Sequence, residues 1–166
     1  MRRVVVISVV LAALAACASN KPAVSAAQLA SLQKQRDTAA IDQIEVVWHK
    51  ASSLKDVNLM MTIWADDATF TVGSQTYTGK AQIRNFFATK AAPFKPQNHW
   101  ESDTPAYKVR ITVNGDQGTL YFECHYIDVA TRKVAAVVAA DQNVERINGR
   151  WLIKSSSSAT PDLTPY

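Results

Sequence analysis

The strongest constraint on the fold is a change in the spacing of apolar residues near Pro93 and Pro96. Before these prolines, apolar residues recur every three or four positions, which is typical of helices buried along one side. After them, apolar and polar residues alternate over long segments, which is typical of strands with one buried face. The sequence therefore predicts an α+β fold in which helices come first and cover one face of a sheet.

The first half of the chain contains three predicted helices. The first begins near Ala27 and carries its clearest apolar stripe from Ile44 to Leu54. Asp56 caps a second, short helix whose apolar residues extend as far as Trp64, and a third helix follows Gly79-Lys80. Between the last two, residues 68–72 and 76–78 are predicted to form a hairpin.

The second half contains five predicted strands, near residues 98–103, 106–113, 118–129, 133–147 and 150–158. Asn148-Gly149 separates the last two strands and suits a two-residue hairpin turn with positive φ. The strand around Tyr121 to Val129 is long enough to curl strongly. We therefore expect an antiparallel meander that is curved into a cone, with the helices at its mouth.

The N-terminus has the parts of a secretory signal peptide. Arg2 and Arg3 precede an apolar run from Val4 to Ala16, which is shorter than the ~20 residues needed to span a bilayer. The end of this run and the next residue, Leu14-Ala15-Ala16-Cys17, resemble the lipobox of bacterial lipoproteins. This resemblance implies cleavage before Cys17, acylation of that cysteine and anchoring in the cell envelope, at the outer membrane in a Gram-negative cell.

These features divide the chain into four parts. Residues 1–16 form the signal peptide, residues 17–26 a lipid-anchored tether, residues 27–158 one folded domain, and residues 159–166 a loose tail. The formal charge of +4 falls to +2 once Arg2 and Arg3 are removed, and no Lys/Arg cluster remains, so nucleic-acid binding has no electrostatic support.

Cysteine and histidine usage argues against disulfide and metal chemistry. With Cys17 acylated, Cys124 has no partner, and we expect it to be a small buried residue. The three histidines, His49, His99 and His125, do not have the spacing of a known metal site, and His49 is expected to face solvent. No cofactor motif is present, so no cofactor is predicted.

Several motifs resemble nuclear transport factor 2-like (SnoaL-like) proteins. They are Trp64-Ala65-Asp66-Asp67, then Gly79-Lys80-Ala81-Gln82-Ile83, and finally Asn148-Gly149-Arg150-Trp151. The resemblance implies a cystatin-like cone, in which a curved antiparallel sheet follows three N-terminal helices. In that family the paired aspartates are a structural signature outside the chemistry. The superfamily contains both enzymes and non-enzymes, so the resemblance alone leaves the function open.

The residues at the ketosteroid isomerase-like catalytic positions of this chain do not fit isomerase chemistry. The oxyanion-binding tyrosine falls on Trp48 and the general base on Val72, which cannot abstract a proton. The second acid falls near Asn143, with Asp141 two residues away on the same strand face.

Scytalone dehydratase-like positions fit only in part. His99 and His125 lie near the two pocket histidines, but the aspartate position falls on Ser53 and one tyrosine position on Val72. The alternation of the strand also places His125 on the outer face of the sheet.

The candidate pocket combines aromatic residues with a few polar groups: Trp48, Trp64, Phe87, His99, Phe122, Cys124, Tyr126, Asp141 and Asn143. Two functions stay open from the sequence. The first is a membrane-anchored, non-catalytic domain that binds a small apolar ligand or a protein partner, including a second copy through the outer sheet face. The second is a lyase- or cyclase-type enzyme that uses His99 and Asp141 on a hydrophobic substrate.

The anchor is directly testable. Replacing Cys17 with alanine removes the only acylation site that the lipobox offers, so the variant should be found in the soluble fraction or stay unprocessed. Cell fractionation with immunoblotting measures both outcomes. A processed Cys17→Ala protein that stays in the membrane fraction would contradict the prediction.

Overall fold

The computed structural model describes residues 24–162. Its elements in chain order are α1 (Ala26–Leu54), α2 (Val57–Met61), β1 (Trp64–Val72), β2 (Gln75–Thr78), α3 (Lys80–Thr89), the 3-10 turn η1 (Ala92–Phe94), β3 (Trp100–Ser102), β4 (Lys108–Asn114), β5 (Gln117–Asp128), β6 (Lys133–Ile147) and β7 (Arg150–Ala159). The predicted Cys17 anchor lies outside the described residues. Within residues 24–162, no helix is both long and apolar enough to cross a bilayer.

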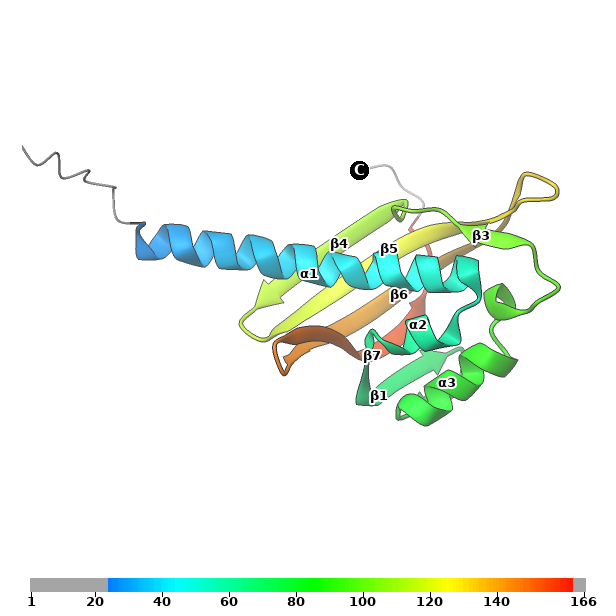
Figure 1. Ribbon diagram of the computed structural model, residues 1–166, viewed down its shortest axis with the longest axis horizontal. Helices are drawn as coiled ribbons and strands as arrows, with labels where there is room; N and C mark the ends of the chain where they lie inside the picture. The colour runs from blue at the N-terminus through cyan, green and yellow to red at the C-terminus, as the bar shows by residue number, and fades with distance from the viewer. Residues whose placement is uncertain (1–23, 163–166) are drawn as a thin grey trace, which may run out of the picture.

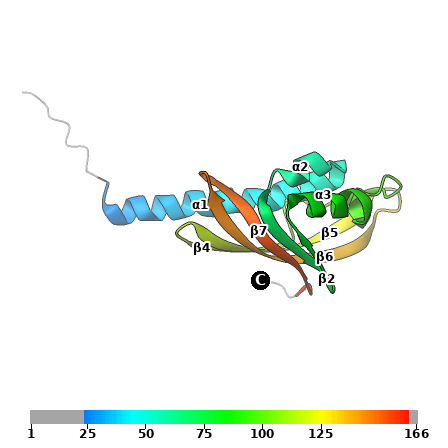
Figure 2. The ribbon, with the colours of Figure 1, turned by 90° about the horizontal axis from the view of Figure 1, so that it is seen from below.

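The strands form one twisted sheet in the order β2-β1-β7-β6-β5-β3, and β4 also pairs with β5. All three helices lie on the same face of this sheet, with α1 running across it (Figures 1 and 2). The predicted α+β cone is therefore confirmed, with one correction. The sheet is mixed rather than fully antiparallel, because β7 runs parallel to β1 and antiparallel to β6.

Helix α1 begins one residue earlier than the sequence predicted. The Ser25 hydroxyl accepts a hydrogen bond from the Gln28 backbone, and the Gln28 side chain bonds back to the Ser25 N–H. This capping box pairs two backbone donors that a helix start otherwise leaves open. At the other end Lys55 adopts a left-handed conformation, which ends the helix.

The second helix is shorter than predicted, and β1 already includes Trp64 and both aspartates that follow. Thr62 follows the last helical residue, and the Ile63 carbonyl then accepts a hydrogen bond from the Ile153 N–H of β7. Sheet pairing therefore outweighs the helical spacing of the apolar residues here. Asp66 pairs with Lys80 at 3.2 Å, and Asp67 pairs with Lys154.

The core is an aromatic cluster around Trp48 of α1. Its ring lies 5.4–6.2 Å, centroid to centroid, from the rings of Trp64, Phe70, Phe87 and Phe122. Because these residues come from β1, α3 and β5, the cluster connects the helical layer to both halves of the sheet. Aromatic pairs at such distances add to the stabilisation from burial.

His49 is buried, which corrects the prediction that it faces solvent. None of its side chain is exposed, its Nδ1 lies 2.7 Å from a Glu45 carboxylate oxygen, and its ring packs edge-on against Phe122. The i, i+4 spacing on α1 places the carboxylate and the imidazole side by side. A buried polar residue needs such a partner, and Glu45 supplies it.

Asp37 connects α1 to the β6–β7 hairpin at the point where the helix meets the sheet. Its carboxylate accepts a hydrogen bond from the Trp151 indole at 3.2 Å and pairs with Arg146 at 2.6 Å. Burial acts to raise the pKa of Asp37, but hydrogen bonds from Gln33, Trp151 and Arg146 outweigh it, and the pKa lies below its usual value. The stability that this carboxylate contributes is therefore present above its unfolded-state pKa and is lost as the pH falls through the lower folded-state pKa.

The residues after β7 include a fixed contact, which corrects the prediction of a loose tail for the part up to Asp162. The Asp162 carboxylate lies 2.9 Å from the Lys108 ammonium group and 3.5 Å from Arg110. Its backbone N–H donates to the buried Glu123 carboxylate at 2.9 Å. This segment therefore covers charged residues on the outer face of the sheet.

Helix α1 packs closely against the sheet at Gly118 of β5. A Cβ atom at this position would lie 2.6 Å from the Thr112 carbonyl oxygen and 3.1 Å from Ile41 Cδ1. Ile41 is fully buried, so the helix cannot move away without opening the core.

Gly118→Ala should therefore destabilise the protein by about 1–3 kcal/mol, because a backbone oxygen must move to admit the methyl group. Chemical denaturation measures the change. Gly115→Asn is the control, because Gly115 has open space around it and asparagine tolerates the positive φ there. Equal stability of Gly118→Ala and the parent protein would contradict the close contact.

Candidate functional site

An apolar pocket of about 170 Å³ opens at the mouth of the cone, between α1, α3, η1 and residues of β1, β5, β6 and β7. Aromatic residues make up much of its wall, with small residues of β6 and β7 beneath them. The lining residues are Trp48, Ser52, Phe70, Val72, Phe86, Phe87, Ala91, Ala92, Pro93, Phe94, Tyr126, Val138, Ala139, Ala140 and Ser158. Hydroxyl groups are the only side-chain polar groups in this lining, apart from the indole N–H of Trp48.

Tyr126 and Ser52 form a hydrogen-bonded pair in the pocket wall. The Tyr126 hydroxyl donates to the Ser52 hydroxyl at 3.2 Å, which in turn donates to the Trp48 carbonyl at 2.9 Å. Burial raises the pKa of Tyr126 well above its ordinary value, so the phenol stays protonated. The Tyr126 oxygen can still accept a hydrogen bond from a bound molecule.

Trp48, Phe87 and Tyr126 are the predicted pocket residues that line this pocket. Trp64, Phe122 and Cys124 lie deeper and are fully buried in the core. Burial raises the pKa of the Cys124 thiol to about 12, so this cysteine has the properties of a packing residue rather than a nucleophile.

Beneath the pocket, the core contains polar side chains that the sequence analysis did not identify. Gln142 and Ser156 are paired across β6 and β7, two residues beyond Ala140 and Ser158 on the same face. Both are at least 96% buried, and neither the Gln142 amide nor the Ser156 hydroxyl has a hydrogen-bond partner among the described residues. The sequence contained one sign of these residues: they are polar at strand positions that face inward, where apolar residues are expected.

Asp141 and Asn143 lie on the outer face of β6 and not in the pocket, which corrects their predicted placement. His99 lies near the far end of the neighbouring strand, where its carbonyl accepts a hydrogen bond from Val129. Asp141 is paired with Tyr121 across β5 and β6. Tyr121 comes eight residues before Val129, so the Asp141 and His99 positions are about 26 Å apart along the strand. The structure therefore does not bring His99 and Asp141 together.

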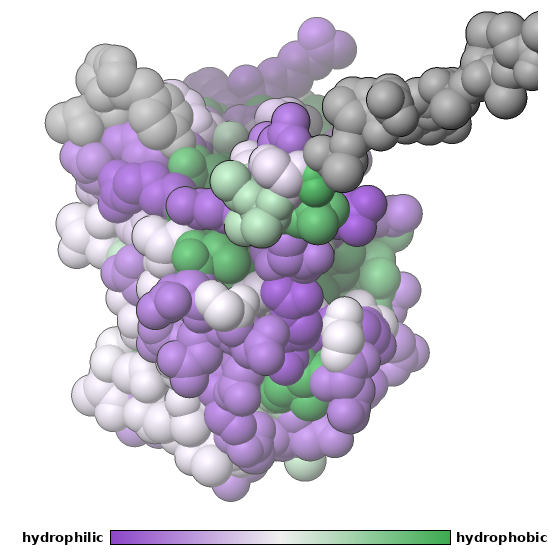
Figure 3. Space-filling view, turned by 90° about the vertical axis from the view of Figure 1, so that its left-hand side faces the viewer, coloured by the Kyte–Doolittle hydropathy of each residue, from purple (hydrophilic) through white to green (hydrophobic). Residues whose placement is uncertain are grey.

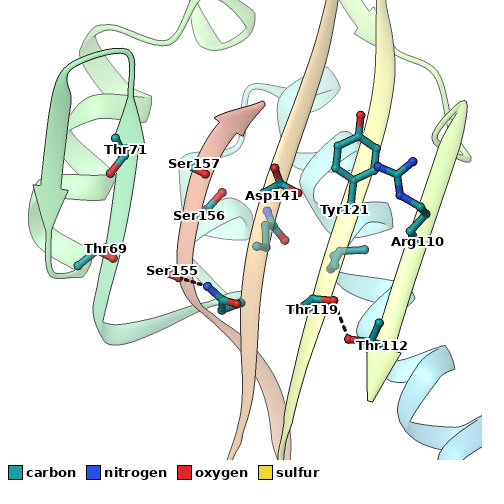
Figure 4. Close-up of a pocket in the computed structure, with 13 residues that line it drawn as sticks. Thr69, Thr71, Arg110, Thr112, Thr119, Tyr121, Asp141, Ser155, Ser156 and Ser157 are labelled. Atoms are coloured by element: carbon teal, nitrogen blue, oxygen red, sulfur yellow. Dashed lines mark hydrogen bonds between the residues drawn. The ribbon is translucent and has the colours of Figure 1, made fainter. Parts of the chain in front are cut away.

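A second, open groove of about 570 Å³ crosses the outer face of the sheet. Figure 4 shows its short polar side chains in two rows that run across the strands. One row joins Thr69, Ser155, Asn143, Thr119 and Thr112, and the other joins Thr71, Ser157, Asp141, Tyr121 and Arg110. Asn143 donates to Ser155 at 2.8 Å, and the Thr112 and Thr119 hydroxyls are 2.7 Å apart.

A charged cluster lies at one end of this groove. Arg110 stacks over the Tyr121 ring at 3.9 Å, and the Tyr121 hydroxyl donates to Glu123, which is fully buried. Burial and the Glu123 contact raise the pKa of Tyr121 to about 12. His125 lies farther along the same face, as its strand position predicted, with Nδ1 3.1 Å from Asp103.

The catalytic arrangements considered from the sequence are not assembled at the pocket. Val72 and Trp48, which occupy the ketosteroid isomerase-like base and tyrosine positions, both line it. The lining contributes no carboxylate, imidazole, amine or thiol from the described part of the chain. Within residues 24–162, no three His, Cys, Asp or Glu side chains are grouped so that they could hold a metal ion.

Solved structures show the same fold at low sequence identity. An NTF2-like protein with a cystatin-like fold from Novosphingobium aromaticivorans is 17% identical, with a TM-score of 0.70 over 84% of this chain and 92% of its own. A protein of unknown function with a cystatin-like fold from Nostoc punctiforme is 16% identical, with a TM-score of 0.66 over 78% and 95%. An NTF2-like protein of unknown function from Pseudomonas putida is 15% identical, with a TM-score of 0.65 over 79% and 98%.

Sequence comparison gives the family directly. No curated protein matches the chain. The family model for the SnoaL-like domain matches residues 33–157, which include the helical layer and nearly the whole sheet. The chain therefore belongs to the family of SnoaL-like domains.

Proposed function

We propose that this protein is a lipid-anchored binding domain that holds a small, mainly apolar molecule in the pocket at the mouth of the cone. The observation that carries this proposal is the lining of the pocket, which is aromatic and aliphatic with a few hydroxyl groups. Such a lining favours the transfer of apolar surface out of water, and a few polar groups suffice to orient the molecule.

The size of the pocket limits the molecule that it can hold. Its volume of about 170 Å³ is close to that of cavities of ~150 Å³ that bind benzene. We therefore expect a ligand about as large as one substituted ring. A hydroxyl group on that ring could donate to Tyr126, whose own proton is directed to Ser52.

Binding fits the pocket better than acid–base catalysis. Val72 occupies the family position of the general base, and the Tyr126 phenol is held protonated by burial. Proton transfer near neutral pH needs a group whose pKa is close to that pH, and the lining residues do not provide one. The lipobox-like Leu14-Ala15-Ala16-Cys17 supports a position at a membrane surface for this binding domain.

Filling the pocket should weaken binding. We expect the processed chain (residues 17–166 with Cys17→Ser, so that no acyl chain is attached) to bind toluene and p-cresol in isothermal titration calorimetry. Ala140→Leu places a larger side chain in the pocket and should weaken both affinities at least about tenfold.

Val137→Leu is the matched control, because Val137 lies on the opposite face of the same strand and is partly exposed. Thermal unfolding checks that each variant is folded. A parent chain that binds neither compound, or a folded Ala140→Leu variant with unchanged affinity, would contradict the proposal.

A further inference from the structure

The first eleven residues of α1 project beyond the rest of the domain (Figure 1). Every residue from Val24 to Arg36 is exposed, and burial begins at Asp37. At 1.5 Å per residue, the projecting part is about 16 Å long. An isolated helix of this length is marginal in water, so a surface that covers one of its faces would stabilise it.

The projecting part carries an apolar stripe that its own domain does not cover. Leu29 is 57% exposed and Leu32 is 48% exposed, and with Arg36 they follow the i, i+3, i+7 spacing of one helix face. Leu32 precedes Ile41 by nine residues, which at about 100° per residue corresponds to the opposite side of the helix. Since Ile41 faces the sheet at Gly118, the stripe faces away from the sheet.

The charges along this segment have one sign. Between Cys17 and Asp37 the sequence contains Lys21, Lys34 and Arg36 and no aspartate or glutamate. Asp37, the first carboxylate, is turned into the domain and pairs with Arg146. Apolar and basic residues without acidic ones suit a surface that offers both acyl chains and negative charge. Figure 3 looks at this end of the molecule and shows apolar surface beside the grey N-terminal trace.

Only a short stretch of chain connects the predicted anchor, Cys17, to the start of α1. The Ser25 cap is eight positions after Cys17, and a fully extended chain spans at most about 28 Å over eight positions. An acyl group on Cys17 would therefore hold the start of α1 near the membrane at all times.

We propose that residues 26–36 of α1 lie on an anionic membrane surface, with Leu29 and Leu32 between the headgroups and Arg36 at the lipid phosphates. This inference rests on the proposed lipid anchor, which supplies the proximity. Trp48 follows Leu29 by 19 residues, so the pocket is about 29 Å farther along the helix axis than the membrane contact.

Vesicle flotation of the processed, unacylated chain tests the contact separately from the anchor. We expect binding to vesicles of phosphatidylcholine and phosphatidylglycerol, and weaker binding to phosphatidylcholine alone or at high salt. Leu29→Gln/Leu32→Gln should reduce the affinity at least about tenfold. Val134→Gln is the control, because Val134 is 57% exposed on β6, outside α1, and its replacement should leave binding unchanged.

Three results would overturn the inference. One is an unacylated parent chain that does not bind the anionic vesicles, and another is a double variant that binds them as well as the parent. The third is a parent chain that sedimentation shows to be a dimer and the double variant to be a monomer, without vesicle binding by either, since the stripe would then contact a second copy.

Fractionation of cells that express the full chain separates this inference from the anchor. Full-length protein in the membrane fraction together with no vesicle binding by the unacylated chain would keep the anchor and overturn the helix contact. Soluble full-length protein together with Leu29- and Leu32-dependent vesicle binding would contradict the anchor and support the contact.

Discussion

The fold depends on the contact between α1 and the sheet, where Ile41 lies close over Gly118. From this point toward the C-terminus of the helix, Glu45, Trp48 and His49 are drawn into the core, and the sheet curves around them. In the other direction, Asp37 is the last residue of the helix that the domain buries. The same contact therefore determines where the cone is filled, where it stays open as a pocket and where the helix leaves the protein.

Much of the architecture could be predicted because its signals are local. The change of apolar spacing after Pro93 and Pro96 predicted a helical layer and a sheet, and the turn at Asn148-Gly149 predicted the last hairpin. The parallel pairing of β1 with β7 was not predictable in this way, because it joins residues 86 to 89 positions apart and leaves no turn to mark it. The buried state of His49 was missed, although Glu45 one turn earlier is the signal that could have indicated it.

The pocket was predicted less completely than the fold. Trp48, Phe87 and Tyr126 could be assigned to it because their elements each have one clearly apolar side. The error at Asp141 and Asn143 has a specific cause in β6. Ala139 and Ala140 are both buried although they face opposite sides of the sheet, since the outer one is beside the Glu123 cluster. Because two small residues follow one another here, the sequence does not show which alternate positions of β6 face inward. It therefore could not indicate the side on which Asp141 and Asn143 lie.

The position of β7 between β1 and β6 has a consequence for synthesis of the chain. The β1–β2 hairpin is complete within the first half of the sequence, yet its only other neighbour in the sheet is formed by residues 150–159. Until that strand is made, the hairpin and α3 have no sheet to join, so a chain emerging from the ribosome cannot close its core before residues 150–159 are present. A protein with this strand order is therefore kept open during translation by its own topology.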